Sequence, residues 1–208
     1  MNKRDFILAS GSLALAGLPA IGHAADSLVA GKDYTVYDPP IRTEAPAGKI
    51  EVLEFFWYAC PHCYSLEPVI TDWASRLPAD VDFRRVHVAF RGDQHQHIYY
   101  TLLAMGKTAE FDGKVFEAIH KQRKRMYDEG EIFDWAAENG LDRAAFEGAW
   151  NSFGVRTQMN KAKQMITAYH VEGVPMMTVN GKYKTAPSMA GSNGRALEII
   201  DALVARER

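Results

Sequence analysis

Cys60 and Cys63 are the only two cysteines in the 208-residue chain, and the sequence between them is Pro-His. Two cysteines at this spacing can alternate between a dithiol and a disulfide, because a thiolate is both the attacking and the leaving group of thiol–disulfide exchange. The apolar run before Cys60 predicts a strand, and the residues after Cys63 have helical spacing. Cys60 therefore falls at a helix N-terminus, where free N–H groups and the helix dipole favour its thiolate. We predict that Cys60 is the nucleophile and that Cys63, one turn further in, is the buried resolving thiol.

The two residues between the cysteines suit this chemistry. Pro61 fits the first helical turn, where its missing N–H group costs nothing. His62 stabilises the Cys60 anion if it is protonated or donates through its ring N–H. We therefore include both residues in the candidate site.

Three other interpretations of the cysteine pair stay open at this point. A purely structural disulfide would contribute little, since the ring that it closes is short. A zinc site needs about four ligands, and His95 and His97 lie far along the chain, two residues apart, where helical side chains do not share a face. We expect these two histidines on the solvated surface, and no metal. The third interpretation is a binding module without redox activity. The presence of both cysteines argues against it.

Glu54 and Pro175 are unusual residues for the strands that contain them. Glu54 lies in the apolar run, six residues before Cys60, and a buried carboxylate is costly unless it is partnered or protonated. It either faces outward or lies buried beside Cys63 as a proton acceptor whose pKa is raised by desolvation. Pro175 follows Gly-Val and opens a later strand, where the loss of a backbone donor is unusual.

The N-terminus has the pattern of a secretory signal peptide. Lys3 and Arg4 precede an apolar stretch, and Gly22 and Ala24 are small residues at the positions that a signal peptidase reads. We predict that residues 1–24 are removed on export, by the general or the twin-arginine route, with a membrane anchor as the alternative. The mature chain would then work in an oxidising compartment, where a cysteine pair can persist as a disulfide.

The composition and the order of elements indicate a globular α/β chain. Hydrophobic residues make up 47% of the sequence, and 24 basic residues nearly balance 26 acidic ones, so we expect no nucleic-acid partner. A strand, a helix and a second strand are followed by four or five helices between residues 95 and 170. A hairpin with an Asn180-Gly181 turn and a closing helix capped by Ser192 or Asn193 complete the chain.

This order resembles an α/β thioredoxin fold with an inserted helical domain, as in the DsbA family of periplasmic disulfide oxidases. The segment "VLEFFWYACPHCY" resembles the family's active-site segment, "VHVAF" the strand before its insertion, and "GVPMMTVNGKY" its later loop and hairpin. The resemblance implies a discontinuous thioredoxin-like domain over residues 25–92 and 163–208. It also implies an inserted helical domain over residues 93–162.

The resemblance implies roles for further residues. In this fold Pro175 is cis and faces the cysteines, so that the backbone of Val174 can pair with an extended substrate peptide. The family pairs the glutamate that matches Glu54 with a lysine, and Arg85 stands in its place here. Arginine keeps its proton, so we expect a charge partner and not a proton relay. His87, on the same strand, is predicted to pack in the core.

The function implied by the resemblance is that of a periplasmic oxidoreductase that donates its Cys60–Cys63 disulfide to unfolded or partly folded exported proteins with free cysteines. It needs no cofactor beyond that disulfide, a membrane partner of the DsbB type reoxidises it, and we expect a monomer. A thiol reductase or disulfide isomerase of the same fold is the alternative. The Pro-His dipeptide favours the oxidase because it stabilises the reduced thiolate, and an isomerase usually needs a dimerisation domain for which the chain has no length.

Overall fold

The structure is a computed structural model that describes residues 28–208, and the predicted signal peptide lies outside the described residues. Strands and helices alternate in the first part of this range, helices occupy the middle, and a hairpin and two helices end it. In chain order the elements are β1 (Thr35–Val36), β2 (Ile50–Phe56), α1 (Pro61–Ala74), β3 (Val81–His87), α2 (Gln94–Ala104), α3 (Thr108–His120), α4 (Glu129–Glu138), α5 (Arg143–Trp150), α6 (Phe153–Ala168), β4 (Met176–Val179), β5 (Tyr183–Thr185), α7 (Pro187–Ala190) and α8 (Asn193–Arg206).

The strands form one mixed sheet in the order β1-β5-β4-β2-β3. Strand β2 runs parallel to β3 and antiparallel to β4, and β5 pairs antiparallel with both β4 and β1. Every residue of β2 is buried, as its nearly continuous apolar sequence predicts for a strand covered on both faces. The expected thioredoxin fold with inserted helices is confirmed.

The register of β2 determines which distant residues meet. Glu54 lies opposite Arg85 of β3, and Phe55 lies opposite Met176 of β4. Since Pro175 directly precedes Met176, this pairing carries Pro175 to the end of β2 that leads to the cysteines. The sheet alone therefore brings two distant segments of the chain, the end of β3 and the start of β4, to the C-terminal end of β2.

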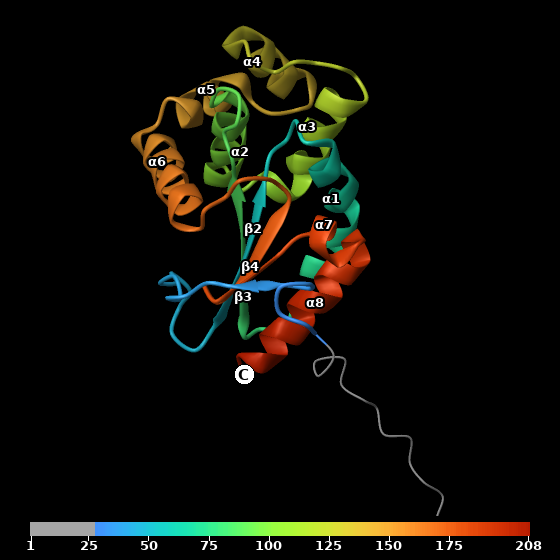
Figure 1. The fold of residues 1–208 in the computed structure, drawn as a ribbon. Coiled ribbons are helices and arrows are strands. Elements are labelled where there is room, and N and C mark those ends of the chain that lie inside the picture. Colours follow the sequence, from blue (N-terminus) through green and yellow to red (C-terminus); the bar gives the residue numbers. More distant parts are fainter. Residues whose placement is uncertain (1–27) are drawn as a thin grey trace, which may run out of the picture.

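Two apolar clusters hold the helices against the sheet. In Figure 1, α1, α7 and α8 lie together on the right of the sheet, and α2, α5 and α6 lie at its upper left. One cluster joins residues of α1 and α8, such as Leu66 and Ile200, to Val52 of β2. The other joins Phe55 and Phe56 to the helices α2–α6. Helix α6 continues through residue 162, so the boundary expected there does not coincide with the end of a helix. Within residues 28–208, no helix is long and apolar enough to cross a membrane.

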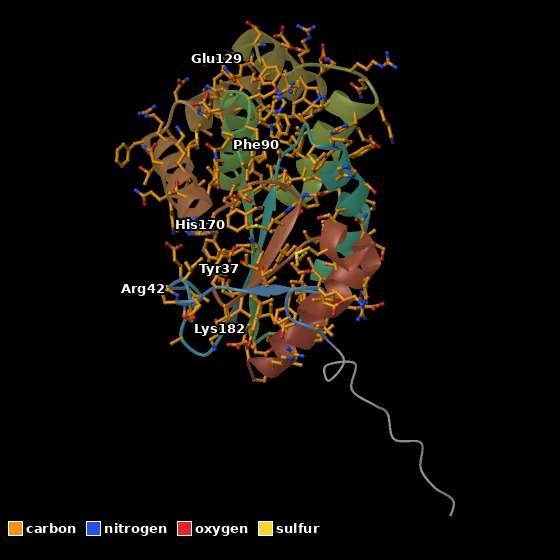
Figure 2. The ribbon with its side chains drawn as sticks, viewed as in Figure 1. Tyr37, Arg42, Phe90, Glu129, His170 and Lys182 are labelled. Atoms are coloured by element: carbon orange, nitrogen blue, oxygen red, sulfur yellow. The ribbon has the colours of Figure 1, made fainter. Side chains whose placement is uncertain are left out.

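The structure adds one strand that the sequence did not indicate and confirms two local signals. Strand β1 lies in the proline-containing lead-in and pairs with β5. Figure 2 labels Tyr37, just beyond β1, close to Lys182. The backbone N–H of Tyr37 donates to the carbonyl of Lys182 over 2.8 Å. Asn180 and Gly181 both have positive φ, as a two-residue hairpin turn requires. Of the two proposed caps, Ser192 is the N-cap of α8, where its hydroxyl accepts from the N–H of Arg195.

Candidate active site

Cys60 occupies the N-cap position of α1, and Pro61 is the first helical residue. No side chain caps this helix end, so the sulfur of Cys60 is the group next to the free N–H groups of the first turn. Cys60 is 8% exposed and Cys63 is fully buried. Both cysteines are unbonded thiols. The predicted placement of a more accessible first sulfur and a more buried second one is confirmed.

The surroundings of Cys60 lower its pKa to about 6. The largest cause is a hydrogen bond from the Cys63 thiol to the Cys60 sulfur, and burial opposes it. The backbone N–H groups of Cys63 and His62 and the charge of His62 lower the pKa further. Cys60 therefore holds a substantial fraction of thiolate at neutral pH, where an ordinary cysteine is almost entirely protonated.

Cys63 has the opposite environment. Burial is the largest cause that raises the pKa of its thiol far above the ordinary value, and the Cys60 sulfur and the charge of Glu54 add to it. When a disulfide between the two sulfurs opens, Cys60 is thus the sulfur that keeps the negative charge, and Cys63 is the one that must take a proton.

The chain before β4 lies directly against Cys60. The Val174–Pro175 peptide bond is cis, as expected. The Cys60 Sγ lies 3.4 Å from the carbonyl oxygen of Val174. This contact is a hydrogen bond only while Cys60 is protonated, because a thiolate has no hydrogen to donate. It therefore belongs to the thiol form, and ionisation of Cys60 removes it.

A groove of about 480 Å³ opens beside this contact. It runs from the active-site helix to the turn before α7 and has a mixed apolar and polar lining that includes His62, Val174, Pro175, Met176, Pro187 and Met189. A molecule held in this groove lies next to both His62 and the Val174–Pro175 bond.

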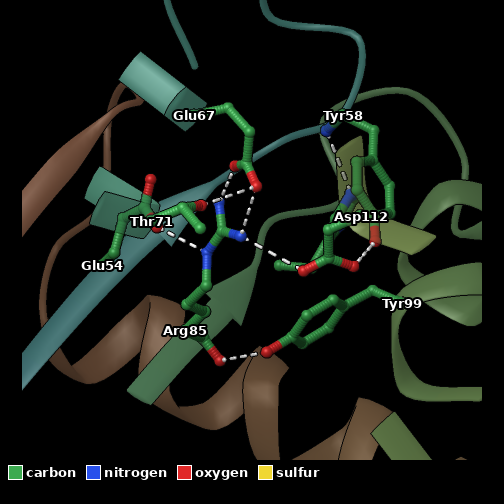
Figure 3. Close-up of polar contacts among 8 residues, drawn as sticks. Glu54, Tyr58, Glu67, Thr71, Arg85, Tyr99 and Asp112 are labelled. Atoms are coloured by element: carbon green, nitrogen blue, oxygen red, sulfur yellow. Dashed lines mark hydrogen bonds and ion pairs between the residues drawn. The ribbon is translucent and has the colours of Figure 1, made fainter. Parts of the chain in front are cut away.

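A buried cluster of charged residues lies under the active-site helix (Figure 3). Arg85 Nε donates to Glu54 Oε2 over 2.6 Å, Nη2 donates to Glu67 Oε2 over 2.6 Å, and Nη1 lies 3.1 Å from Asp112 Oδ2. Arg85 also lies over the ring of Phe56, 4.2 Å from its centroid. Glu54 is fully buried, which excludes the outward-facing alternative. The predicted pairing of Glu54 with Arg85 is present.

The cluster and its surroundings include residues that the sequence did not single out. Glu67 comes from α1 and Asp112 from α3, and Tyr58 Oη donates to Asp112 Oδ1 over 2.5 Å. His120, at the end of α3, stacks on Tyr64 with ring centroids 4.8 Å apart and donates through Nε2 to the carbonyl of Tyr58 over 2.7 Å. Tyr58 stands within the active-site segment and could have been selected on that ground. No local pattern distinguishes Asp112 from an exposed helical aspartate.

Three histidines outside the active-site helix, at positions 87, 95 and 97, pack against neighbouring residues. His87 is buried as predicted, and its Nε2 accepts from the backbone N–H of Tyr58 over 3.2 Å. The prediction that His95 and His97 lie on the solvated surface is wrong. His95 is buried and bonds to the carbonyl of Arg125, and His97 stacks on Trp150 with centroids 3.6 Å apart. His95 stacks on Tyr127, and His97 is half-buried against Trp150. Polarity along the sequence does not reveal such ring contacts.

Comparison with known proteins gives matches over most of the chain. A family model described as a DSBA-like thioredoxin domain matches residues 51–195. The chain belongs to this family. The thiol:disulfide interchange protein DsbA of Pseudomonas aeruginosa strain PAO1 is 42% identical over 207 residues, which cover 99% of this chain and 97% of the relative. The protein of the same name from Bordetella parapertussis is 42% identical over 180 residues, 85% of each chain.

Solved structures agree with this assignment. The crystal structure of Pseudomonas aeruginosa DsbA has a TM-score of 0.84 and 44% identity, covering 88% of this chain and 96% of the other. The oxidoreductase NmDsbA1 from Neisseria meningitidis has a TM-score of 0.77 and 28% identity, covering 86% and 93%. The chain is thus a thiol–disulfide oxidoreductase of the DsbA family, and the expected family is confirmed.

Proposed function

We propose that this protein works as an oxidase, which donates its Cys60–Cys63 disulfide to newly exported proteins with free cysteines. The compartment we propose is the periplasm, because the N-terminal sequence has the pattern of a cleaved export signal. The redox-active group is the cysteine pair itself, without a further cofactor. The observation that carries the proposal is the position of Cys60 at the uncapped N-terminus of α1, where it is more accessible than the fully buried Cys63, so that the two thiols differ in acidity.

The exchange proceeds in two steps. A substrate thiolate attacks the sulfur of Cys60, the bond between Cys60 and Cys63 breaks, and Cys63 leaves and takes up a proton. A second substrate thiolate then attacks the substrate sulfur of the mixed disulfide, and Cys60 leaves as a thiolate. The substrate has lost two electrons and gained a disulfide, and the protein holds one thiolate, one thiol and both electrons.

The environment of Cys60 favours this direction. With a pKa of about 6, the Cys60 thiolate is a good leaving group in the second step, since a sulfur with a lower pKa leaves faster. The same interactions stabilise the reduced form and so make the disulfide more oxidising. A reductase needs surroundings that favour the disulfide over the thiolate, whereas the surroundings of Cys60 favour the thiolate.

Substrate binding is proposed at the groove beside Val174. A peptide whose cysteine reaches Cys60 also meets the backbone of Val174 and Pro175, where an extended segment can add main-chain hydrogen bonds. The mixed lining of the groove suits unfolded chains of varied sequence, which share a backbone but not a side-chain pattern.

Glu54 exchanges a proton with Cys63, and Arg85 is its charge partner. After each turnover the Cys60–Cys63 pair must be reoxidised, for which we propose a membrane protein of the DsbB type, with the oxidase itself a monomer. We also propose that the chain divides into a signal peptide at 1–24, a thioredoxin-like domain at 25–92 and 163–208, and a helical domain at 93–162.

Two measurements test the oxidase function. Equilibration of Cys60 and Cys63 with glutathione buffers should give a reduction potential more positive than about −200 mV, in the range of oxidising proteins. A value below about −250 mV indicates a reductase and contradicts the proposal. A Cys63→Ser variant should accumulate mixed disulfides with a reduced peptide through Cys60, and a Cys60→Ser variant should not. Adducts on Cys63 in the second variant would reverse the assigned roles.

A further inference from the structure

The buried cluster around Arg85 has more negative than positive groups. The guanidinium contacts the carboxyl groups of Glu54, Glu67 and Asp112. If all three carboxyls were ionised, one positive charge would face three negative ones in a site from which water is excluded. Burial of uncompensated charge is costly. The cluster therefore retains a proton at neutral pH. This proton lies on the carboxyl group whose ionised form is least stabilised by its contacts.

The contacts of the three carboxyl groups differ. Both oxygens of Glu67 accept from Arg85, over 2.6 Å and 3.3 Å. Both oxygens of Asp112 accept hydrogen bonds, from Tyr58 Oη at 2.5 Å and from Arg85 Nη1 at 3.1 Å. Glu54 accepts from Arg85 through Oε2 only, and its Oε1 is buried without a hydrogen-bond partner. A proton on Glu54 Oε1 costs no existing contact, whereas a proton on Asp112 weakens one of its two.

We propose that Asp112 shares Arg85 with Glu54 and thereby keeps the cluster's proton on Glu54, as a positioning residue for the exchange at Cys63. The inference rests on the proposed role of Glu54 in that exchange. Burial raises the pKa of both carboxyls, that of Asp112 to about 7. The negative charge of Glu67 raises both pKa values further, and that of Glu54 adds to the rise at Asp112. The two groups thus bind protons in competition.

The reaction requires this proton at a defined moment. When a substrate thiolate opens the disulfide, Cys63 leaves as a thiolate in a buried position, and the proton of Glu54 passes to its sulfur. Glu54 is then ionised beside Arg85, and the reverse transfer occurs when Cys63 next attacks. An arginine paired only with Glu54 would keep that carboxyl ionised, so Asp112 offsets the effect of Arg85.

Three other titratable groups around the cluster keep their charge state near pH 7. Tyr58 and Tyr99 have pKa values raised far above neutrality by burial, and burial lowers the pKa of His87 well below its ordinary value, so none of them changes charge near pH 7. The titratable groups that act on Asp112 or Glu54 come from the turn after β2, from α1, from β3 and from α2, and they are Tyr58, Cys63, Glu67, Arg85 and Tyr99. His87 contacts the backbone of Tyr58 instead.

The test is a ¹³C NMR titration of the side-chain carboxyls in the disulfide form, in which neither sulfur titrates. The Glu54 signal is assigned by its loss in a Glu54→Gln variant. In the wild-type protein we expect Glu54 to titrate above the ordinary glutamate range, and the Glu54 and Asp112 curves to show the same two steps, because coupled groups share macroscopic pKa values. Independent single-step curves would overturn the proposal without any further variant.

Matched variants separate a shared proton from a structural role. Asp112→Asn removes a charge and retains an acceptor for Tyr58, and we expect the Glu54 midpoint to fall by about one pH unit. Tyr58→Phe destabilises the Asp112 anion, transfers the proton towards it and should also lower the Glu54 midpoint. Glu110→Gln, an exposed change on the same helix, should leave it in place.

If the Glu54 midpoint does not move in Asp112→Asn, the inference is contradicted. If that variant does not fold, the coupled or independent shape of the wild-type titration curves decides the inference. The oxidase function is measured separately, by oxidation of a reduced peptide with the wild-type protein at pH 7. Failure there refutes the proposed function and does not change the carboxyl titration.

Discussion

The stability of the reduced and oxidised forms should depend differently on pH. Reduction of the Cys60–Cys63 disulfide is the perturbation, and only the reduced form has a Cys60 thiol that can ionise. Its pKa falls from 9.0 in an ordinary environment to about 6 in the folded protein. A depressed pKa contributes stability that is fully present above pH 9 and is lost as the pH falls through 6.

The magnitude follows from the two pKa values. Linkage gives the folded reduced form about 0.4 kcal/mol at pH 6, about 1.4 kcal/mol at pH 7 and about 3.7 kcal/mol at pH 9. These are upper values, since water near the partly accessible sulfur screens the interactions. Closure of the four-residue ring gives the oxidised form about 2 kcal/mol, independent of pH, in the loop-entropy model. The oxidised form should therefore be the more stable one at pH 6 and the reduced form at pH 9.

The assay is a series of urea unfolding curves for the oxidised and the dithiothreitol-reduced protein at each pH from 6 to 9. The difference in unfolding free energy should change by about 3 kcal/mol over this range and reverse sign between about pH 7 and pH 8. The titration of surface groups largely cancels in the difference in unfolding free energy, because the oxidised and the reduced form contain the same surface groups. Reduced Cys63→Ser should keep the pH dependence, because the serine hydroxyl can still donate to the Cys60 sulfur. Reduced Cys60→Ser should lose it. A difference that stays flat from pH 6 to pH 9 refutes a stabilised Cys60 thiolate.

Three further changes test the surroundings of the cysteines. Glu54→Gln should slow thiol exchange about a hundredfold, as for loss of a general acid–base group, with a modest loss of stability; stopped-flow rates with a reduced peptide check this, and an unchanged rate excludes the role. Arg85→Met should cost about 3–5 kcal/mol of unfolding free energy at pH 7, because three buried carboxyls lose their cation. The loss should shrink as the pH is lowered and the carboxyls protonate, and Arg85→Lys, which keeps the charge, is the control. Ser192→Ala removes the N-cap of α8 and should cost about 1 kcal/mol in urea unfolding, whereas Ser188→Ala, which removes no N-cap, should not.

Much of the chemistry was accessible from the sequence because it depends on residues close together in the chain. A strand, two cysteines and a helix follow one another directly, so the position of Cys60 at the helix N-terminus was predictable from local pattern. The Asn180-Gly181 turn is likewise local. The place of Pro175 opposite the cysteines came from the resemblance to the DsbA family and not from the pattern itself.

The tertiary structure decided which distant side chains share the buried site. Arg85 meets Glu54 through strand register, and Asp112 reaches Arg85 across 27 residues of sequence and Tyr58 across 54. Polarity along the chain places an aspartate in a helix on the surface, and it did the same, wrongly, for His95. Whether a polar side chain is exposed depends on what packs over it, and packing between elements is a property of the assembled fold. The sequence by itself therefore determined the reactive pair, and only the fold determined the charges that control its protons.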